Sequence, residues 1–127
     1  METLDKFPKG KILIIDDEKM LLELFRRILT TYGFAVDVAE SAKQGIKKIH
    51  TIKYNLIFTD IKMPGMSGHE LFDYVKKNVD QAIPIIAMSG TPWLLKNSNF
   101  DAVIAKPFCK EEMLDMVHQF IQEPEPQ

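Results

Sequence analysis

Short runs of apolar residues alternate along the chain with longer stretches in which apolar residues recur every three or four positions. Residues 11–15 form an almost wholly apolar run, too short for a helix and typical of a strand buried on both faces. Comparable runs predict strands over 54–59, 83–88 and 102–105. Residues 34–38 alternate between apolar and polar side chains, which indicates an edge strand with one exposed face.

The stretches between these runs have the spacing of amphipathic helices. The first predicted helix buries one apolar face, made of Met20, Leu21, Leu24, Phe25, Ile28 and Leu29. Gly33 follows it as a predicted C-cap. Ser41 and Gln44 resemble a capping box, which predicts the start of a second helix. The inner residues of that helix would include Ile46 and Ile49.

Two later helices are predicted by similar apolar stripes, which consist of Leu71, Phe72 and Val75 in one and of Met113, Leu114, Val117, Phe120 and Ile121 in the other. Strands that alternate with helices favour right-handed crossovers and a parallel sheet covered on both faces. The sequence therefore predicts an α/β fold with a doubly wound, five-stranded parallel sheet.

The length, charge and cysteine content of the chain exclude several classes of protein. A chain of 127 residues suits one domain with a single core. Its formal net charge of −2 argues against nucleic acid as the main ligand, because backbone phosphates require a concentrated positive field. No apolar run approaches the length of a membrane span, and the N-terminus has no hydrophobic signal segment. Cys109 is the single cysteine, so no internal disulfide can form. We expect a cytoplasmic protein that binds no membrane.

Polar residues follow four of the predicted strands at the point where each strand ends; they are Asp16, Asp17, Asp60, Ser89 and Lys106. In parallel α/β sheets, ligands bind outside the carboxyl ends of the strands. The apolar runs that precede these residues offer no other reason for a charge at that place. We therefore expect the five side chains to converge on one pocket.

Residue types in this predicted pocket indicate phosphoryl chemistry. Three crowded carboxylates repel each other, and a hard divalent cation relieves that repulsion. Mg²⁺ fits better than a transition metal, because no His or Cys is placed to join the set. A carboxylate beside Mg²⁺ can act as a nucleophile toward phosphorus. The Lys106 ammonium and the Ser89 hydroxyl can then neutralise oxygens of the transferred group.

Four sequence blocks occur in a shared order: IIDDE at 14–18, DIKMPGMSG at 60–68, SG at 89–90 and KPF at 106–108. In these blocks the chain resembles the receiver domain of bacterial two-component response regulators, and the likeness covers nearly the whole chain. The resemblance implies a flavodoxin-like (βα)5 fold with strand order 2-1-3-4-5. It also implies that Asp60 is the phosphoacceptor. Asp17 would bind Mg²⁺ directly with Asp16 nearby, and the backbone carbonyl of Lys62 would complete the protein's metal ligands along with Asp60.

The resemblance further implies that Ser89 is a switch hydroxyl, that Lys106 senses the phosphoryl group and that the Lys106–Pro107 peptide is cis. Two features depart from the family pattern. Val103 occupies a position that is usually aromatic, three residues before the lysine. Only 17 positions separate Ser89 from Lys106, and residues 91–99 have little apolar periodicity, which predicts a shortened or irregular fourth helix.

These implications predict a receiver domain over 11–122, preceded by an extension over 1–10 and followed by a polar tail over 123–127. Its phosphodonor would be a sensor histidine kinase or a histidine phosphotransfer protein, and its output an unidentified effector protein or domain. The domain would not be an ordinary enzyme, although it would assist its own phosphorylation and dephosphorylation. Two alternatives remain: an interaction module with weak or absent phosphorylation-driven switching, and a hydrolase with an aspartyl nucleophile. The hydrolase is disfavoured because Lys62 stands where its general acid would be required.

Overall fold

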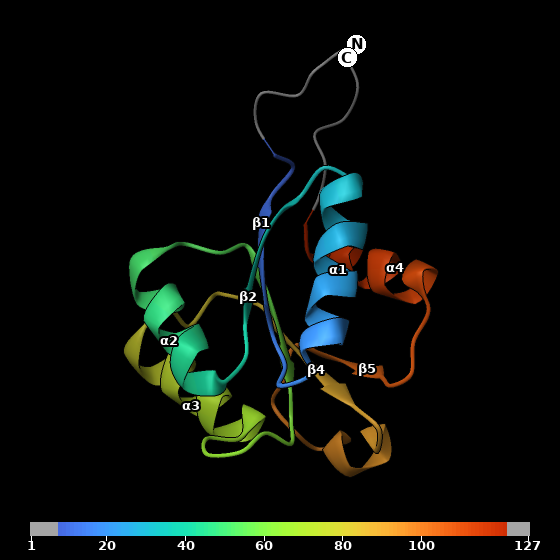
Figure 1. Cartoon of the computed structure of the whole chain (residues 1–127). Coiled ribbons are helices and arrows are strands. Elements are labelled where there is room, and N and C mark those ends of the chain that lie inside the picture. Colours follow the sequence, from blue (N-terminus) through green and yellow to red (C-terminus); the bar gives the residue numbers. More distant parts are fainter. Residues whose placement is uncertain (1–7, 122–127) are drawn as a thin grey trace.

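The computed structural model describes residues 8–121, and these form a five-stranded parallel sheet between two layers of helices (Figure 1). The strand order is β2-β1-β3-β4-β5, as predicted. The strands are β1 (Lys11–Ile15), β2 (Ala35–Ala39), β3 (Leu56–Asp60), β4 (Ile85–Ser89) and β5 (Ala102–Ala105). All five predicted strands are thus confirmed, with small differences at their ends.

The connections between the strands are helical. They comprise α1 (Lys19–Thr31), α2 (Ala42–Thr51), α3 (Gly68–Asn78), the 3₁₀ helix η1 (Pro92–Leu95) and, after β5, α4 (Lys110–Phe120). A full fourth crossover helix is missing, because η1 has only four residues between β4 and β5. The prediction of a short fourth helix is therefore confirmed.

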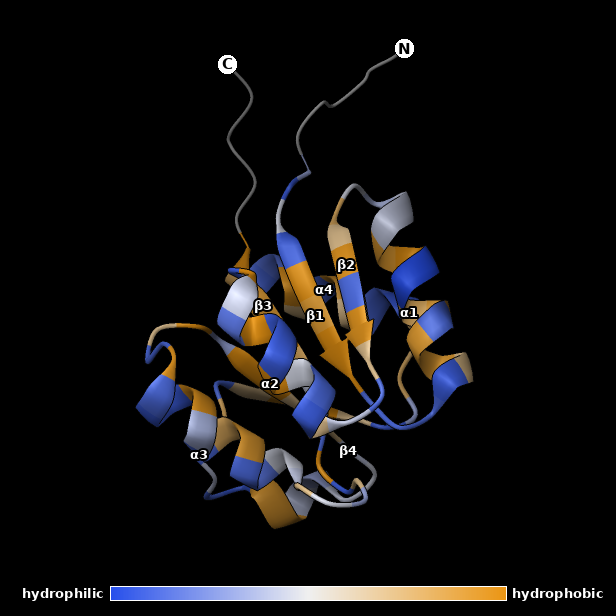
Figure 2. Ribbon diagram, turned by 60° about the vertical axis from the view of Figure 1, so that its left-hand side comes forward, coloured by the Kyte–Doolittle hydropathy of each residue, from blue (hydrophilic) through white to orange (hydrophobic). Residues whose placement is uncertain are grey.

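Two apolar cores lie on opposite faces of the sheet. Ile12 and Ile14 of β1 belong to the core beneath α1 and α4. Their neighbours Leu13 and Ile15 belong to the core beneath α2 and α3. This division follows from the two-residue repeat of a strand, which directs alternate side chains to opposite faces. Figure 2 shows the same pattern, with strands that are mostly hydrophobic and helices whose outward faces are hydrophilic.

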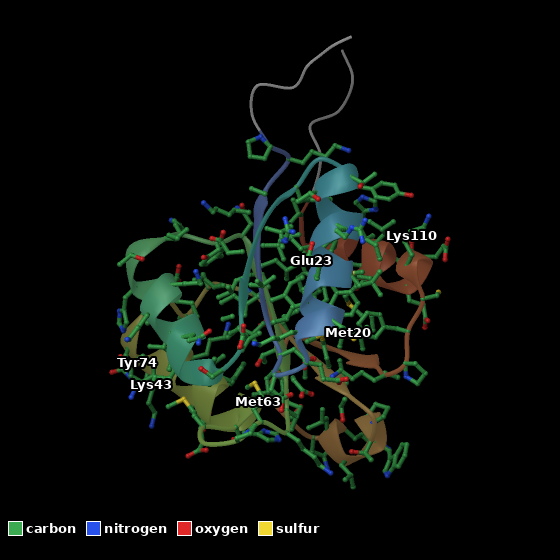
Figure 3. All side chains as sticks on the ribbon, in the orientation of Figure 1. Met20, Glu23, Lys43, Met63, Tyr74 and Lys110 are labelled. Atoms are coloured by element: carbon green, nitrogen blue, oxygen red, sulfur yellow. The ribbon has the colours of Figure 1, made fainter. Side chains whose placement is uncertain are left out.

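The predicted apolar face of α1 is partly wrong. Met20 and Leu24 are 88% and 52% exposed, whereas Leu22 is buried. A helix turns about 100° per residue, so Met20 lies roughly opposite Leu22 around the helix. The buried stripe consists of Leu22, Phe25 and Leu29, and Leu21 and Ile28 pack along its edge. Figure 3 labels Met20 on α1, on the same side of the sheet as Lys110 of α4.

The predicted helix ends are mostly confirmed. Gly33 has a φ of +98° just after α1, a conformation that glycine adopts without steric cost. The Ser41 hydroxyl accepts the amide N–H of Gln44 at 3.2 Å, as in a capping box. The reciprocal bond differs, because the Gln44 side chain accepts the amide of Glu40 instead. In α2, Ile49 is buried and Ile46 packs against the core.

Parts of the predicted segments lie outside residues 8–121. The predicted tail over 123–127 lies outside the described residues, as does most of the predicted extension over 1–10. None of the helices within 8–121 combines the length and the apolar character that a bilayer crossing requires.

Candidate functional site

Three carboxylates meet at the carboxyl ends of the two central strands. Asp16 and Asp17 follow β1, and Asp60 is the last residue of β3, which pairs with β1 along its length. Each of the three offers an oxygen, and these oxygens all lie within 4.8 Å of one another. Asp16 has no exposed surface, whereas Asp17 is exposed. The predicted acidic cluster is thus present. It extends from the buried Asp16 through the partly buried Asp60 to the exposed Asp17.

Asp16 is held by two bonds. Its Oδ1 atom accepts the backbone N–H of Glu18 at 2.9 Å, and its Oδ2 atom accepts Nζ of Lys106 at 2.8 Å. The N–H of Glu18 is at the N-terminal end of α1, where backbone amides lack partners within the helix. A buried carboxylate requires such partners, because an unpaired charge in the interior is costly. Asp16 therefore has a fixed orientation.

Lys106 connects β5 to the acidic cluster. Its Nζ atom lies 3.3 Å from Oδ1 of Asp60 as well as 2.8 Å from Asp16. Burial alone would lower the pKa of Lys106, but its bonds and charge interactions with these two carboxylates outweigh that effect and raise the pKa above its ordinary value. Lys106 is thus a fixed cation. Its backbone N–H donates to the carbonyl of Ser89 at 2.8 Å, and the peptide bond to Pro107 is cis, as predicted.

Asp60 has a different environment from an exposed aspartate. Burial, followed by the negative charge of Asp16, raises the pKa of Asp60 above its ordinary value. The ammonium of Lys106 and the N–H of Ile61, which donates to Oδ1 at 3.0 Å, act in the opposite direction but do not cancel the effect. The ionised form of Asp60 would therefore be stabilised by a further cation.

Ser89 lies at the end of β4, next to β3. A cavity of about 140 Å³ opens between the end of β3 and the segment after β4, and its lining comprises Asp60, Ile61, Lys62, Ser89, Gly90 and Thr91. The Ser89 hydroxyl accepts the N–H of Thr91 at 3.0 Å and is 3.4 Å from the Thr91 hydroxyl. The cavity therefore brings Ser89 and Lys62 to the side of Asp60 as the sequence predicted. The metal-ligand role of the Lys62 carbonyl stays a prediction.

Two residues at the site were not predicted from the sequence. Thr91 lines the cavity, and the spacing Ser-x-Thr was a signal that could have indicated a second hydroxyl there. Gly68 begins α3, and a Cβ atom at this position would lie 2.4 Å from the carbonyl oxygen of Asp60. Only glycine permits this approach, so α3 packs directly against the end of β3. The Gly68 N–H also donates to the carbonyl of Ile61 at 3.0 Å.

The candidate metal ligands at this site fit a hard divalent cation. Within the described residues, the grouped candidate ligands are three carboxylates, with no histidine or cysteine among them. Oxygen-only sets of this kind suit Mg²⁺ or Ca²⁺ better than a transition metal.

Comparison with known proteins gives consistent results. The family model of the response regulator receiver domain matches residues 12–118. The transcriptional regulatory protein ResD of Bacillus subtilis is 30% identical over 116 residues, which cover 87% of this chain and 48% of ResD. The chain thus spans about half the length of that relative. The chemotaxis response regulator CheY4 of Vibrio cholerae matches in fold, with a TM-score of 0.81 and 22% identity over 87% of this chain and 98% of that chain.

A further solved structure also matches the fold. The response regulator protein TrrA of Thermotoga maritima, in complex with Mg(2+)-BeF, has a TM-score of 0.78 and 29% identity. The match covers 87% of this chain and 97% of that chain.

Proposed function

The chain belongs to the response regulator receiver domain family, and on this premise we propose that Asp60 accepts a phosphoryl group from a phosphohistidine. Phosphorylation-based two-component signalling is the function that this family membership supports. The observation that carries the residue assignment is the position of the Lys106 ammonium, within 2.8 Å of Asp16 and 3.3 Å of Asp60. That cation is held in place before any phosphoryl group arrives.

In the proposed transfer, a carboxylate oxygen of Asp60 attacks the phosphorus atom. A new O–P bond forms, the N–P bond of the phosphohistidine breaks, and its electron pair stays on the imidazole nitrogen of the donor. The phosphoryl oxygens carry negative charge throughout. Lys106 stabilises one oxygen through its ammonium, and Ser89 donates its hydroxyl to another. In dephosphorylation, a water oxygen would attack the same phosphorus: a new O–P bond forms, the O–P bond to Asp60 breaks and its electron pair returns to the carboxylate. Inorganic phosphate leaves with one proton of the water, and the other proton passes to solvent. The same groups would stabilise the phosphoryl oxygens, so the domain would assist its own dephosphorylation.

Asp16, Asp17, Asp60 and the carbonyl of Lys62 would hold a Mg²⁺ ion at this site. When bound, the ion supplies charge neutralisation and orientation for the transferred group. The three carboxylates fit this role because they present oxygens within 4.8 Å of one another. Lys106 limits the repulsion among them through its contacts with Asp16 and Asp60.

The proposed phosphodonor is a sensor histidine kinase or a histidine phosphotransfer protein, and a groove beside the site supports docking of such a partner. A cavity of about 310 Å³ lies between α1 and the segment after β5, against Leu21, Leu24, Phe25, Lys106 and Phe108. Its lining is mostly apolar, and one lining residue, Leu24, is exposed. A helix of the donor that packs here would bring its phosphohistidine beside Lys106.

We further assign the receiver domain to 11–122, with an extension over 1–10, a polar tail over 123–127 and a cytoplasmic location. The output is assigned to an effector protein or domain, and neither nucleic acid nor membrane is proposed as a ligand of this domain. The alternative, a receiver-like module without phosphorylation-driven switching, is not favoured, because the phosphoacceptor, the cation and the hydroxyl are brought together at one edge of the sheet.

Incubation with Mg²⁺ and acetyl phosphate, followed by intact mass measurement, tests the assignment. The wild-type chain should gain one phosphoryl group, and Asp60→Asn should gain none. Asp73→Asn is the matched control, because Asp73 is an exposed acid on α3 and should leave phosphorylation unchanged. Failure of the wild type to gain mass, or equal gain by Asp60→Asn, would refute the proposal.

A further inference from the structure

Helix α2 presents two lysines side by side to solvent. Lys43 and Lys47, the lysine pair, are the second and sixth residues of the helix, and both are exposed. Residues four apart on a helix are neighbours, separated by about 6 Å along its axis. Like charges at this spacing repel each other, and Lys43 lies in the first turn, where the helix dipole disfavours a cation. The lysine pair is therefore a concentrated positive charge that the helix itself does not favour.

Helix α4 has the same arrangement with the opposite charge. Glu111 and Asp115, the acid pair, are the second and sixth residues of α4, and both are exposed. Counted from the start of each helix, the acids thus occupy the positions that the lysine pair occupies in α2. In both helices these positions point away from the buried side of the helix. The two pairs are therefore matched in spacing and opposite in charge.

Neither pair is neutralised by its own chain. Within residues 8–121, no salt bridge includes a member of the lysine pair or of the acid pair. Glu40, the acid nearest to the lysine pair in the sequence, lies 3.8 Å from Lys19. Lys110, the lysine nearest to the acid pair, has its ammonium 5.7 Å from the centroid of the Tyr32 ring on α1. Both pairs are thus available to an external partner.

The two pairs cannot meet within one copy of the chain. α2 and α3 cover one face of the sheet, and α1 and α4 cover the other (Figure 1). Lys43, labelled in Figure 3, lies across the sheet from α4. A second copy can bring its acid pair to the lysine pair of the first, and its own lysine pair then stays free for a third copy. Such a contact is heterologous, and like charges oppose a symmetric contact of α2 with α2 or of α4 with α4.

We propose that α2 of one copy docks against α4 of a second copy, with the lysine pair opposite the acid pair. When the two helices lie antiparallel, Lys43 faces Asp115 and Lys47 faces Glu111, because both pairs have a spacing of four residues. Exposed ion pairs hold this contact, so it is weak and sensitive to salt. The contact does not require phosphorylation of Asp60, so it stands or fails separately from the proposed function.

Sedimentation velocity of the full chain over a range of protein concentrations tests the docking. At about 0.02 M NaCl the sedimentation coefficient should rise with concentration, and species larger than a dimer should form. At about 0.5 M NaCl the association constant should be at least about tenfold lower. A wild-type chain that stays monomeric at low salt would overturn the proposal. An association that salt leaves unchanged, or that stops at a dimer, would also overturn it.

Lys43→Glu combined with Lys47→Glu should lower the association constant at least about tenfold, because like charges then face each other. Lys77→Glu combined with Lys96→Glu is the matched control. Both of these lysines are exposed and lie outside α2, and the change in net charge is the same. The control should associate as wild type does. An equal loss in the control would assign the effect to net charge and would overturn the specific contact.

Glu111→Lys combined with Asp115→Lys should cause a similar loss, because the lysine pair then meets lysines. An equimolar mixture of this variant with the variant that carries Lys43→Glu and Lys47→Glu should recover association, since each supplies the charge that the other lacks. All four side chains are exposed, so each variant should keep the wild-type fold, which circular dichroism verifies. Failure of the mixture to associate would overturn the pairing of α2 with α4.

Discussion

The ammonium of Lys106 lies 2.8 Å from Oδ2 of Asp16, a carboxylate with no exposed surface. The lysine thus has a second task besides any contact with a phosphoryl group, because it compensates a buried charge. A residue that supports both the fold and the chemistry requires an experiment that separates the two roles.

Lys106→Met should lower the free energy of unfolding by about 2 kcal/mol in the presence of a chelator, because it leaves Asp16 buried without its charged partner. Urea denaturation measures the change. Lys47→Met is the control, since Lys47 is exposed on α2 and its replacement should change stability by no more than about 0.5 kcal/mol.

Adding Asp16→Asn to Lys106→Met should recover part of the lost stability, because the unpaired charge is then removed. If the double variant is as unstable as the sum of the two single variants, the two residues are not coupled in the way the structure indicates.

Gly68→Ala should destabilise the protein by roughly 2 kcal/mol, because the added Cβ would lie 2.4 Å from the carbonyl oxygen of Asp60 and the start of α3 must shift. The same shift should slow phosphorylation by acetyl phosphate. Gly90→Ala is the control for stability, since a Cβ there has no neighbour within 4 Å. Equal stability of the two variants in urea would contradict the tight packing at Gly68.

Leu22→Ala should destabilise the protein by about 3 kcal/mol, whereas Leu24→Ala should change the free energy of unfolding by less than about 0.5 kcal/mol. The reason is that Leu22 is 2% exposed in the core and Leu24 is 52% exposed. Thermal or urea unfolding distinguishes them. The reverse order would show that α1 packs with the face that its sequence pattern alone suggests.

Mg²⁺ binding should weaken as the pH falls, because the ion and protons compete for the same carboxylates. Since the pKa of Asp60 is raised in the metal-free protein, the loss should begin at a higher pH than for a carboxyl group with an ordinary pKa. Titration calorimetry across pH measures this, together with proton release on binding. In Asp60→Asn the affinity should be lower and its pH dependence should move to lower pH; an unchanged profile would exclude Asp60 as the group responsible.

Sequence patterns predicted the sheet and its strand order because each buried strand is a distinct apolar run that ends in a polar residue. The candidate site residues could be predicted from the sequence for a related reason, since the carboxyl ends of parallel strands meet at one edge of the sheet. The sequence was a poorer guide to which face of α1 is buried. Met20 and Leu24 have the right spacing for a buried face, but so do Leu22, Phe25 and Leu29, and only packing against the sheet decides between the two.

The hydrogen-bond partners of Ser89 could not be predicted from the sequence either, because the bond to Thr91 depends on how the chain turns after β4. The close approach at Gly68 is a similar case. A glycine before a helix has several possible explanations, and only the position of the Asp60 carbonyl identifies the one that applies here.

The charges of the acidic cluster and of Lys106 would balance on addition of one divalent ion. Three carboxylates face one ammonium, which leaves an excess of two negative charges, the charge that one divalent ion cancels. Conversion of the Asp60 carboxylate into an aspartyl-phosphate dianion adds one more negative charge to that balanced set. The phosphorylated pocket would then carry a single unpaired negative charge, and the ammonium that it can attract is that of Lys106, which also pairs with the buried Asp16.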